Sequence, residues 1–227
     1  MTIAACYVSS EGVVLGSDST TTFPVPATLP DGTSGYRSEH YDSAQKLFEL
    51  GDDSTAGVLV WGLGGLGDLS FRSLFVRVES EARSKKLSTL QEVAGLVSAE
   101  FWAEYTARFQ EVIDYLKEPA ASDDVAKEKK DILDTLSGGF CIGGRWDRAS
   151  AKPEAWFVEY APLPAVAPVP VELTVGQFRL WGWENLVQRL NWGIDENLYQ
   201  DILRSGKWSG TEEELFGLVK QYAIYCP

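Results

Sequence analysis

Histidine is almost missing from this chain, since His40 is the single histidine among 227 residues. Metal sites built from several histidines, and catalytic triads built on a histidine base, would all depend on that one side chain. Cysteine is scarce too, and the three that occur, Cys6, Cys141 and Cys226, are widely spaced. An odd number of separated cysteines suits a reducing compartment better than a disulfide scaffold. The sequence therefore predicts no metal site and a cytoplasmic location.

Positive charge is also scarce. The chain has 20 Lys and Arg but 33 Asp and Glu, which gives a net charge of −13. Nucleic acids and anionic membrane surfaces are bound by clustered Lys and Arg, so neither is expected as a partner. Long apolar runs are missing as well. Residues 56–66 form one of the longest, and it is too short and too rich in glycine to span a bilayer. The N-terminus carries neither a basic segment nor a signal-like apolar stretch.

The arrangement of expected elements favours one layered domain. A chain of this length, with an ordinary hydrophobic fraction of 44%, can bury one sizeable core, so residues 1–227 are expected to form a single domain. The proline- and glycine-rich stretch 21–42 is expected to be a long loop. Strands are expected at 2–9, 12–20, 44–50, 56–62, 139–145, 155–160 and 177–182, the first two as a hairpin. Helices are expected from 68 onward and at 88–118, 123–136, 184–190, 196–203 and 211–225. Ser88 with Gln91, and Thr211 with Glu214, have capping-box spacing. Because one block of helices separates two sets of strands, the fold class is predicted as α+β, a sandwich of antiparallel sheets.

Thr2 directly follows the initiator methionine. If Met1 is removed, Thr2 carries both a nucleophile, its hydroxyl Oγ, and a base, its freed α-amine, with an ordinary pKa of about 7.7–8.0. This pairing is the threonine form of nucleophilic catalysis. Met-Thr alone is a common way for a chain to begin, so the interpretation depends on the residues that come after Thr2.

Three further features fall at the ends of expected strands. Asp18 closes the second strand, Lys46 opens the third, and the glycine turn, residues 62–68, joins the fourth strand to the first helix. A buried Lys46 paired with Asp18 would hold the pKa of a neighbouring amine low. Backbone N–H groups of the glycine turn could bind a developing oxyanion. Each feature also has a plain interpretation, as a strand-end acid, a solvated edge lysine and a turn in which glycine serves packing.

The glycine turn also has the spacing of a dinucleotide-binding motif. Gly62-Leu-Gly-Gly-Leu-Gly67 matches Gly-x-Gly-x-x-Gly literally, but no alternating strand–helix–strand pattern surrounds it. The Gly-Lys-Ser/Thr ending of a phosphate-binding loop is missing too. No nucleotide or other cofactor is therefore expected.

Together these motifs resemble the proteasome β-subunits and HslV-type proteases and their bacterial relatives such as Anbu, which are N-terminal-nucleophile (Ntn) hydrolases. The resemblance covers residues 2–85. Its motifs in this chain are Thr2, Gly16-Ser17-Asp18-Ser19, Lys46-Leu47-Phe48 and Gly64-Gly65-Leu66-Gly67-Asp68. It implies a four-layer αββα Ntn-hydrolase sandwich, in which two antiparallel sheets are flanked by helices.

The resemblance also implies roles for individual residues. Thr2 would be the nucleophile and, through its amine, the general base. Lys46 would lower the pKa of that amine, Asp18 would hold Lys46, and the N–H of Gly64 would bind the oxyanion. The implied substrate-binding residues are Thr22 for the substrate backbone and Ala44, Phe48, Gly62 and Leu66 for the side-chain pocket.

The chain departs from the family pattern near its C-terminus. Gly182-Trp183-Glu184-Asn185 stands where the family has Gly-Ser-Gly, so the serine that supports the catalytic amine is missing. Glu184 or Asn185 would have to replace it. The later Asp-x-x-Ser-Gly motif is absent, and the sequence stops at Pro227 where the family adds a helix and strands, which would fit a C-terminally truncated form.

Three functions remain open at this level. The first is an N-terminal threonine hydrolase, a peptidase that cleaves amide bonds of a peptide substrate through a Thr2 acyl-enzyme, inside a ring or helical homo-oligomer. The second is a catalytically inactive proteasome-like subunit with a structural or binding role, in which Met1 stays in place. The third is an amidase of the same fold that acts on a small molecule. An ATPase partner is compatible with the resemblance, and the sequence does not identify one.

Overall fold

The computed structural model of the chain describes residues 3–28, 34–41, 44–51, 55–146, 152–182, 194 and 196–222. The chain divides into two compact units, residues 1–180 and 181–227. The described elements define an α+β protein with antiparallel sheets, in agreement with the predicted fold class. The prediction of a single domain stays a prediction.

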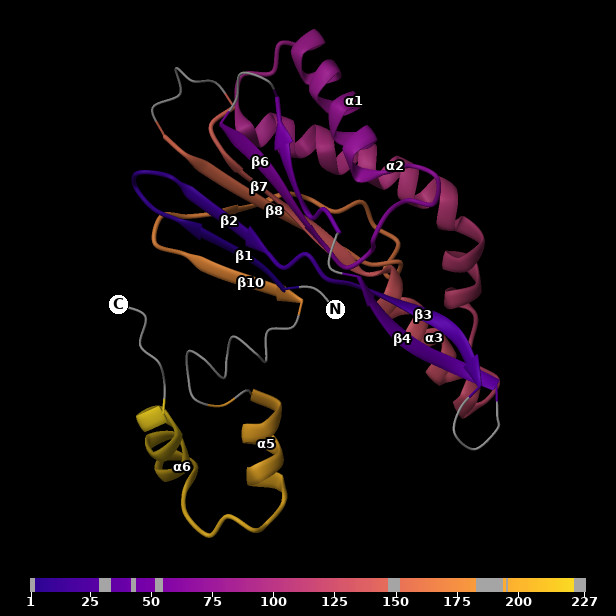
Figure 1. Cartoon of the computed structure of the whole chain (residues 1–227), viewed down its shortest axis with the longest axis vertical. Helices are drawn as coiled ribbons and strands as arrows, with labels where there is room; N and C mark the ends of the chain where they lie inside the picture. Colours follow the sequence, from indigo (N-terminus) through magenta and orange to yellow (C-terminus); the bar gives the residue numbers. More distant parts are fainter. Residues whose placement is uncertain are drawn as a thin grey trace. The chain divides into compact units, whose positions relative to one another are not determined.

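A five-stranded antiparallel sheet forms the centre of the first unit (Figure 1). Its spatial order is β5-β6-β7-β8-β9, and each strand pairs antiparallel with the next. The strands are β5 (Leu47–Leu50), β6 (Ala56–Trp61), β7 (Gly138–Gly144), β8 (Glu154–Tyr160) and β9 (Val171–Leu173). The two middle strands β6 and β7 are therefore joined through the long helical segment that separates them in sequence.

A second, three-stranded sheet packs on one face of the first. It has the order β10-β1-β2, with β1 (Ile3–Val8), β2 (Val13–Ser17) and β10 (Phe178–Gly182). Along β1 the buried residues alternate, and Ala4, Cys6 and Val8 are all at most 1% exposed. Side chains of β2 lie against glycines of β6 and β7, since Val13 is next to Gly143 and Leu15 is next to Gly57. The hairpin predicted for the N-terminal strands is confirmed.

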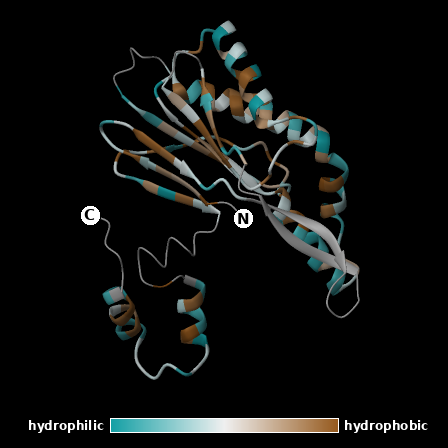
Figure 2. Ribbon diagram, viewed as in Figure 1, coloured by the Kyte–Doolittle hydropathy of each residue, from teal (hydrophilic) through white to brown (hydrophobic). Residues whose placement is uncertain are grey.

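Two helices cover the other face of the five-stranded sheet (Figure 1). They are α1 (Phe71–Ser84) and α2 (Leu90–Lys117). Hydrophobic residues are concentrated where these helices lie against the strands (Figure 2). Aromatic rings pack between the helices and the sheet. The centroid of the Phe101 ring lies 4.3 Å from that of Tyr160 and 5.6 Å from that of Phe140. The first unit is thus a stack of helices, sheet and sheet.

The third helix, α3 (Asp123–Leu136), is attached to the end of α2. Its Lys129 is 9% exposed and donates hydrogen bonds to the carbonyl oxygens of Tyr115 and Glu118. These carbonyls belong to the last turn and C-cap of α2, where the usual N–H partner four residues later is missing; the Tyr115 carbonyl also accepts from the Glu118 N–H at 3.3 Å. A lysine side chain therefore caps one helix from the next.

The prediction of a long loop at 21–42 is wrong. Thr21–Thr28 (β3) and Ser34–Tyr41 (β4) form an antiparallel hairpin of their own. Prolines argued against a strand here because proline has no N–H to donate to a ladder. Pro24 and Pro26 are two positions apart, however, and alternate residues of a strand direct their N–H groups to the same side. Both prolines can therefore lie on the open edge of a two-stranded hairpin.

The predicted helix starts are close but shifted. The first helix begins at Phe71 with Ser70 as its N-cap, so Asp68 precedes the helix instead of opening it. The second helix has its capping box at Thr89 and Glu92, one residue beyond the predicted Ser88 and Gln91. The predicted third helix and the capping box at Thr211 with Glu214 are confirmed.

The second unit contains α5 (Glu196–Arg204), α6 (Glu212–Val219) and the short 3-10 helix η1 (Lys220–Tyr222). Ile194, Tyr199 and Leu215 form a small hydrophobic cluster between them. The helix predicted at 184–190 lies outside the described residues. Across the described parts of both units, no helix combines the length and the apolar character that crossing a membrane requires.

Candidate active site

Lys46 and Asp18 form an ion pair at the edge of the two sheets. Lys46 Nζ lies 2.8 Å from Asp18 Oδ1, and the Lys46 side chain is 8% exposed against 27% for that of Asp18. Lys46 Nζ also donates a hydrogen bond of 2.6 Å to the carbonyl oxygen of Thr20. The contact expected from the sequence between these two residues is present. The Lys46 ammonium is largely shielded from water and has two oxygen partners, as a buried charge requires.

The backbone explains why these side chains meet. Lys46 comes directly before β5, and its carbonyl oxygen accepts a hydrogen bond from the N–H of Val60 in β6. Asp18 follows β2, and its N–H donates to the carbonyl oxygen of Ile3 in β1. Each residue is therefore fixed to a different sheet, and the ion pair bridges them.

Asp18 also contacts the beginning of the described chain through its side chain. Its Oδ1 accepts a hydrogen bond of 2.9 Å from the backbone N–H of Ile3. The Ile3 nitrogen belongs to the peptide bond that joins Ile3 to Thr2. The Lys46 ammonium and this peptide N–H thus bind the same carboxylate oxygen. Thr2 itself lies outside the described residues, so the structure gives no position for the predicted nucleophile.

The Asp18 carboxyl group is held in its ionised form. Burial by itself would raise its pKa, but the hydrogen bond from Lys46 and the one from the Ile3 N–H outweigh burial, so the pKa of Asp18 is lowered. Because both donors bind the charged form, the carboxylate stays negative at any pH above the ordinary range for aspartate. The Asp18 carboxylate is therefore charged at neutral pH.

The glycine turn leaves β6 and reaches α1 through a small bridge. Gly62 has a φ of 83°, and a Cβ at this position would lie 2.3 Å from the carbonyl oxygen of Ser137, so only glycine fits. Leu66 and Leu69 exchange two backbone hydrogen bonds of 3.1 Å each. Gly64 lies between these points and is exposed, with no atom within 4 Å of where its Cβ would be. Space is therefore available beside the predicted oxyanion donor.

The turn does not use the helix N-terminus as expected. Five residues separate Gly64 from the N-cap Ser70, whose side chain accepts a hydrogen bond from the N–H of Ser73. The first-turn N–H groups of α1 are thus partly satisfied by the helix itself. Any oxyanion contact of Gly64 would come from the turn alone, without the dipole of α1.

The predicted substrate-binding residues are spread over several environments. Phe48 is 7% exposed and packs against Phe75, with ring centroids 5.3 Å apart, and Leu66 is fully buried in the same core. Ala44 is half-buried and donates its N–H to the carbonyl oxygen of Ser19. Thr22 lies opposite His40 in the β3–β4 hairpin, and its side chain lies outside the description. Gly62 is the glycine that the close approach of Ser137 requires.

Sequence reasoning missed two contributors to this region. The Thr20 carbonyl oxygen is one, and no sequence signal marks a backbone acceptor. Arg108 of α2 is the other, and its Nη2 lies 3.2 Å from Asp68 Oδ1 at the end of the glycine turn. Forty positions separate Arg108 from Asp68, and only the local pair with Glu104, four residues earlier, could have been expected.

Two cavities among the described residues have other lining residues than those of the predicted site. One is lined by α2 and α3, with Phe109 and Leu136 in its wall, and another by Tyr199 and Phe216 of the second unit. None of the predicted site residues borders either one. Within the described ranges, no group of three or more His, Cys, Asp or Glu side chains could hold a metal ion.

Comparison with known proteins adds no assignment. No protein-family model matches the chain, and no curated protein is similar to it in sequence. Any functional proposal therefore rests on the residues and the geometry of this chain.

Proposed function

We propose that this protein is an N-terminal threonine hydrolase that cleaves amide bonds after Met1 has been removed. The observation that carries the proposal is the single Asp18 oxygen that binds both the buried Lys46 ammonium and the Ile3 N–H, one residue after Thr2. A lysine that served only as a solvated edge charge would not be 8% exposed with two oxygen partners. The arrangement supports a positive charge close to the start of the chain.

The proposed reaction needs no cofactor. Thr2 Oγ attacks the carbonyl carbon of the amide, and its proton passes to the Thr2 amine. The Lys46 charge keeps the pKa of that amine low enough for it to act as a base, because two positive charges close together repel each other. The tetrahedral intermediate places its oxyanion at the Gly64 N–H, then expels the amine product, which takes the proton. Water hydrolyses the remaining Thr2 ester, which frees the acid and restores the enzyme.

The proposed fold is the four-layer Ntn sandwich. Three layers are described in the first unit, namely the α1 and α2 helices, the five-stranded sheet and the three-stranded sheet. The proposed fourth layer would be helical and would cover the free face of the three-stranded sheet, where Tyr7 and Phe178 are exposed. We further propose a cytoplasmic protein that self-associates through its long helices into a ring or helical stack, with peptides as substrate.

Three successive measurements test the proposal. Intact mass of the purified protein should show a chain that begins at Thr2, because a retained Met1 would block the amine. An electrophile that reacts with N-terminal threonine should then label the protein stoichiometrically, and Thr2→Ala should abolish labelling. Lys46→Met should lower turnover by at least about 100-fold, the range for loss of one acid–base or electrostatic contribution.

The alternatives predict different results. A chain that keeps Met1 and takes up no label would be an inactive subunit. Turnover of small amides without turnover of a peptide panel would identify a small-molecule amidase. Full turnover in both Thr2→Ala and Lys46→Met would remove the proposed chemistry altogether.

A further inference from the structure

The glycine turn, residues 62–68, is held by the buried Leu66 but has a flexible backbone around Gly64. It has four glycines, and Gly62 and Gly67 have φ angles of 83° and 64°. Glycine loses more conformational freedom on ordering than any other residue. Within the turn, the backbone bridge between Leu66 and Leu69 lies beyond Gly64, on the side of the helix. Contacts from other elements are therefore needed to keep the Gly64 N–H in a fixed place.

Arg108 supplies such a contact from the middle of α2. Its Nη2 lies 3.2 Å from Asp68 Oδ1. Its aliphatic part also passes the turn, because a Cβ on Gly67 would lie 3.9 Å from Arg108 Cδ. Asp68 is 92% exposed, so no burial holds its side chain toward α2. The guanidinium thus attaches Asp68, at the end of the turn, to the helix layer, in addition to the burial of Leu66 in the core.

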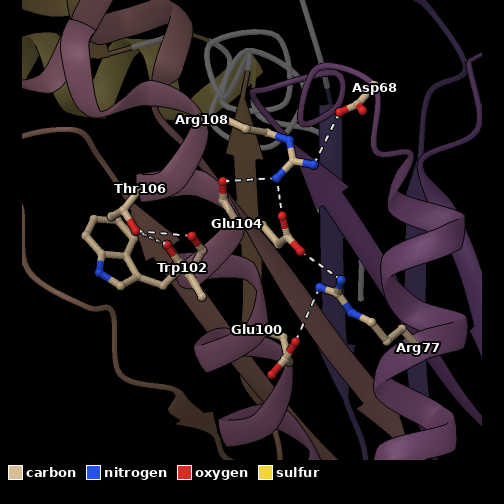
Figure 3. A network of polar contacts seen from close by, with 8 residues as sticks. Asp68, Arg77, Glu100, Trp102, Glu104, Thr106 and Arg108 are labelled. Carbon is tan, nitrogen blue, oxygen red and sulfur yellow. Dashed lines mark hydrogen bonds and ion pairs between the residues drawn. The ribbon is translucent and has the colours of Figure 1, made fainter.

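Arg108 is in turn fixed by a chain of alternating charges (Figure 3). Its Nη1 donates to the carboxylate of Glu104, and Glu104 also accepts from Arg77 of α1 at 2.7 Å. Arg77 reaches Glu100 as well, at 3.3 Å. The hydrogen bond from Arg77 and the one from Arg108 lower the pKa of Glu104, so this carboxylate stays charged between the two guanidinium groups. The network therefore joins α1, α2 and the glycine turn.

We infer that this network positions the glycine turn for the proposed hydrolysis, with Arg108 and Asp68 as positioning residues for the Gly64 N–H. The inference rests on the proposed function. Exposed ion pairs contribute little to the stability of a fold. A gain in stability therefore does not by itself explain why Arg77, Glu104, Arg108 and Asp68 are linked. Arginine suits the role because its planar fork binds two carboxylates in fixed directions.

The test uses Arg108→Met and Asp68→Asn in the full-length protein. Both variants should keep the wild-type melting temperature but lower kcat by about 10-fold with little change in KM, because an oxyanion donor acts in the transition state. The double variant should be no slower than Arg108→Met alone, since both changes remove the same contact. Asp68→Glu, which keeps the charge, should recover most of the lost kcat.

Hydrogen exchange provides a measurement that does not depend on hydrolysis. Amide exchange in the segment 62–69 should be about 10-fold faster in Arg108→Met and Asp68→Asn than in the wild type. Lys117→Met is the matched control, because Lys117 forms an exposed ion pair with Asp114 on the same helix and away from the turn. It should change neither exchange nor kcat.

Each outcome has a defined meaning. Unchanged exchange in both variants overturns the inference, whatever the hydrolysis assays give. Faster exchange with unchanged kcat, in an enzyme that Thr2→Ala inactivates, also overturns the positioning role. If exchange is faster but Thr2→Ala leaves the protein fully active, Arg108 does restrain the turn, and it is the proposed function that is wrong.

Discussion

At the scale of single residues, the Asp18 carboxylate has the largest structural effect for its size. One of its oxygens accepts from the Ile3 N–H in β1 and from Lys46 next to β5. Placing an ammonium away from water is costly unless it finds oxygen partners, and Asp18 and the Thr20 carbonyl provide them. Asp18 therefore stabilises the junction of two sheets as well as the proposed site.

This role predicts a stability that depends on pH. A carboxyl group whose pKa is lower in the folded state stabilises the fold above its unfolded pKa, about 3.9 for aspartate, and loses that contribution as the pH falls through the folded value. The pKa of Asp18 is lowered in the fold. Asp18→Asn should therefore reduce the free energy of unfolding by about 2 kcal/mol at pH 7, and the difference from wild type should shrink below about pH 4.

Urea unfolding of both proteins between pH 3 and pH 7 measures this difference. Asp114→Asn is a suitable control, because Asp114 forms an ion pair on an exposed helix surface. Its effect should be much smaller than that of Asp18→Asn at every pH, because water and salt screen an exposed pair. A difference for Asp18→Asn that is constant down to pH 3 would contradict the structural role.

At the scale of elements, the sequence predicted those helices and strands whose formation depends on residues close together in the chain. The helix expected at 123–136 has those bounds in the structure, where Ser122 is its N-cap and Ser122 Oγ accepts from the Val125 N–H. The strands at 56–62 and 155–160 were recognised within one residue of their observed ends because they are apolar and β-branched or aromatic. The hairpin β3–β4 was missed because pairing with a partner strand, and not local propensity, allows its prolines.

A prediction at this scale concerns the start of α2. Thr89 Oγ1 accepts from the Glu92 N–H while the Glu92 carboxylate accepts from the Thr89 N–H, which completes a capping box. Thr89→Ala should destabilise the protein by about 1 kcal/mol, the usual loss when a threonine cap is removed. Thermal or urea unfolding measures the change.

Thr106→Ala is the matched control within the same helix. Thr106 Oγ1 donates to the carbonyl oxygen of Trp102 one turn earlier (Figure 3). Alanine has the higher helix propensity at an interior position, so this change should stay within about 0.5 kcal/mol of wild type. Equal effects of Thr89→Ala and Thr106→Ala would mean that capping does not account for the stability of this helix end.

At the scale of the whole first unit, the interface between the two sheets contains a pair of thiols. Cys6 of β1 and Cys141 of β7 are both fully buried. The hydrogen bond between them, and then burial, raise the pKa of Cys141, while the same hydrogen bond lowers that of Cys6. Two reduced cysteines therefore form part of the packing between the sheets.

Burial at this interface predicts low reactivity. A thiol reacts as its thiolate and only when a reagent can reach it, so neither cysteine should be alkylated while the sheets stay packed. Peptide mapping after treatment with N-ethylmaleimide should find both unlabelled in the native protein and both labelled in urea. Labelling of Cys6 or Cys141 under native conditions would contradict the packing of the two sheets.

By itself, the sequence determined the helices and most of the strands of the first unit to within a few residues, and the residue types available for catalysis, but it missed the β3–β4 hairpin. All of these depend on residues close together in the chain, or on composition alone. Only the tertiary structure decided which distant side chains meet. It brings Arg108 to Asp68 across 40 positions, which nothing in the sequence indicated, and Lys46 to Asp18 across 28, which the sequence offered only as one of two interpretations. Such contacts depend on how the sheets and helices stack. The stacking is determined by hydrophobic burial over the whole fold, so no local sequence pattern predicts it.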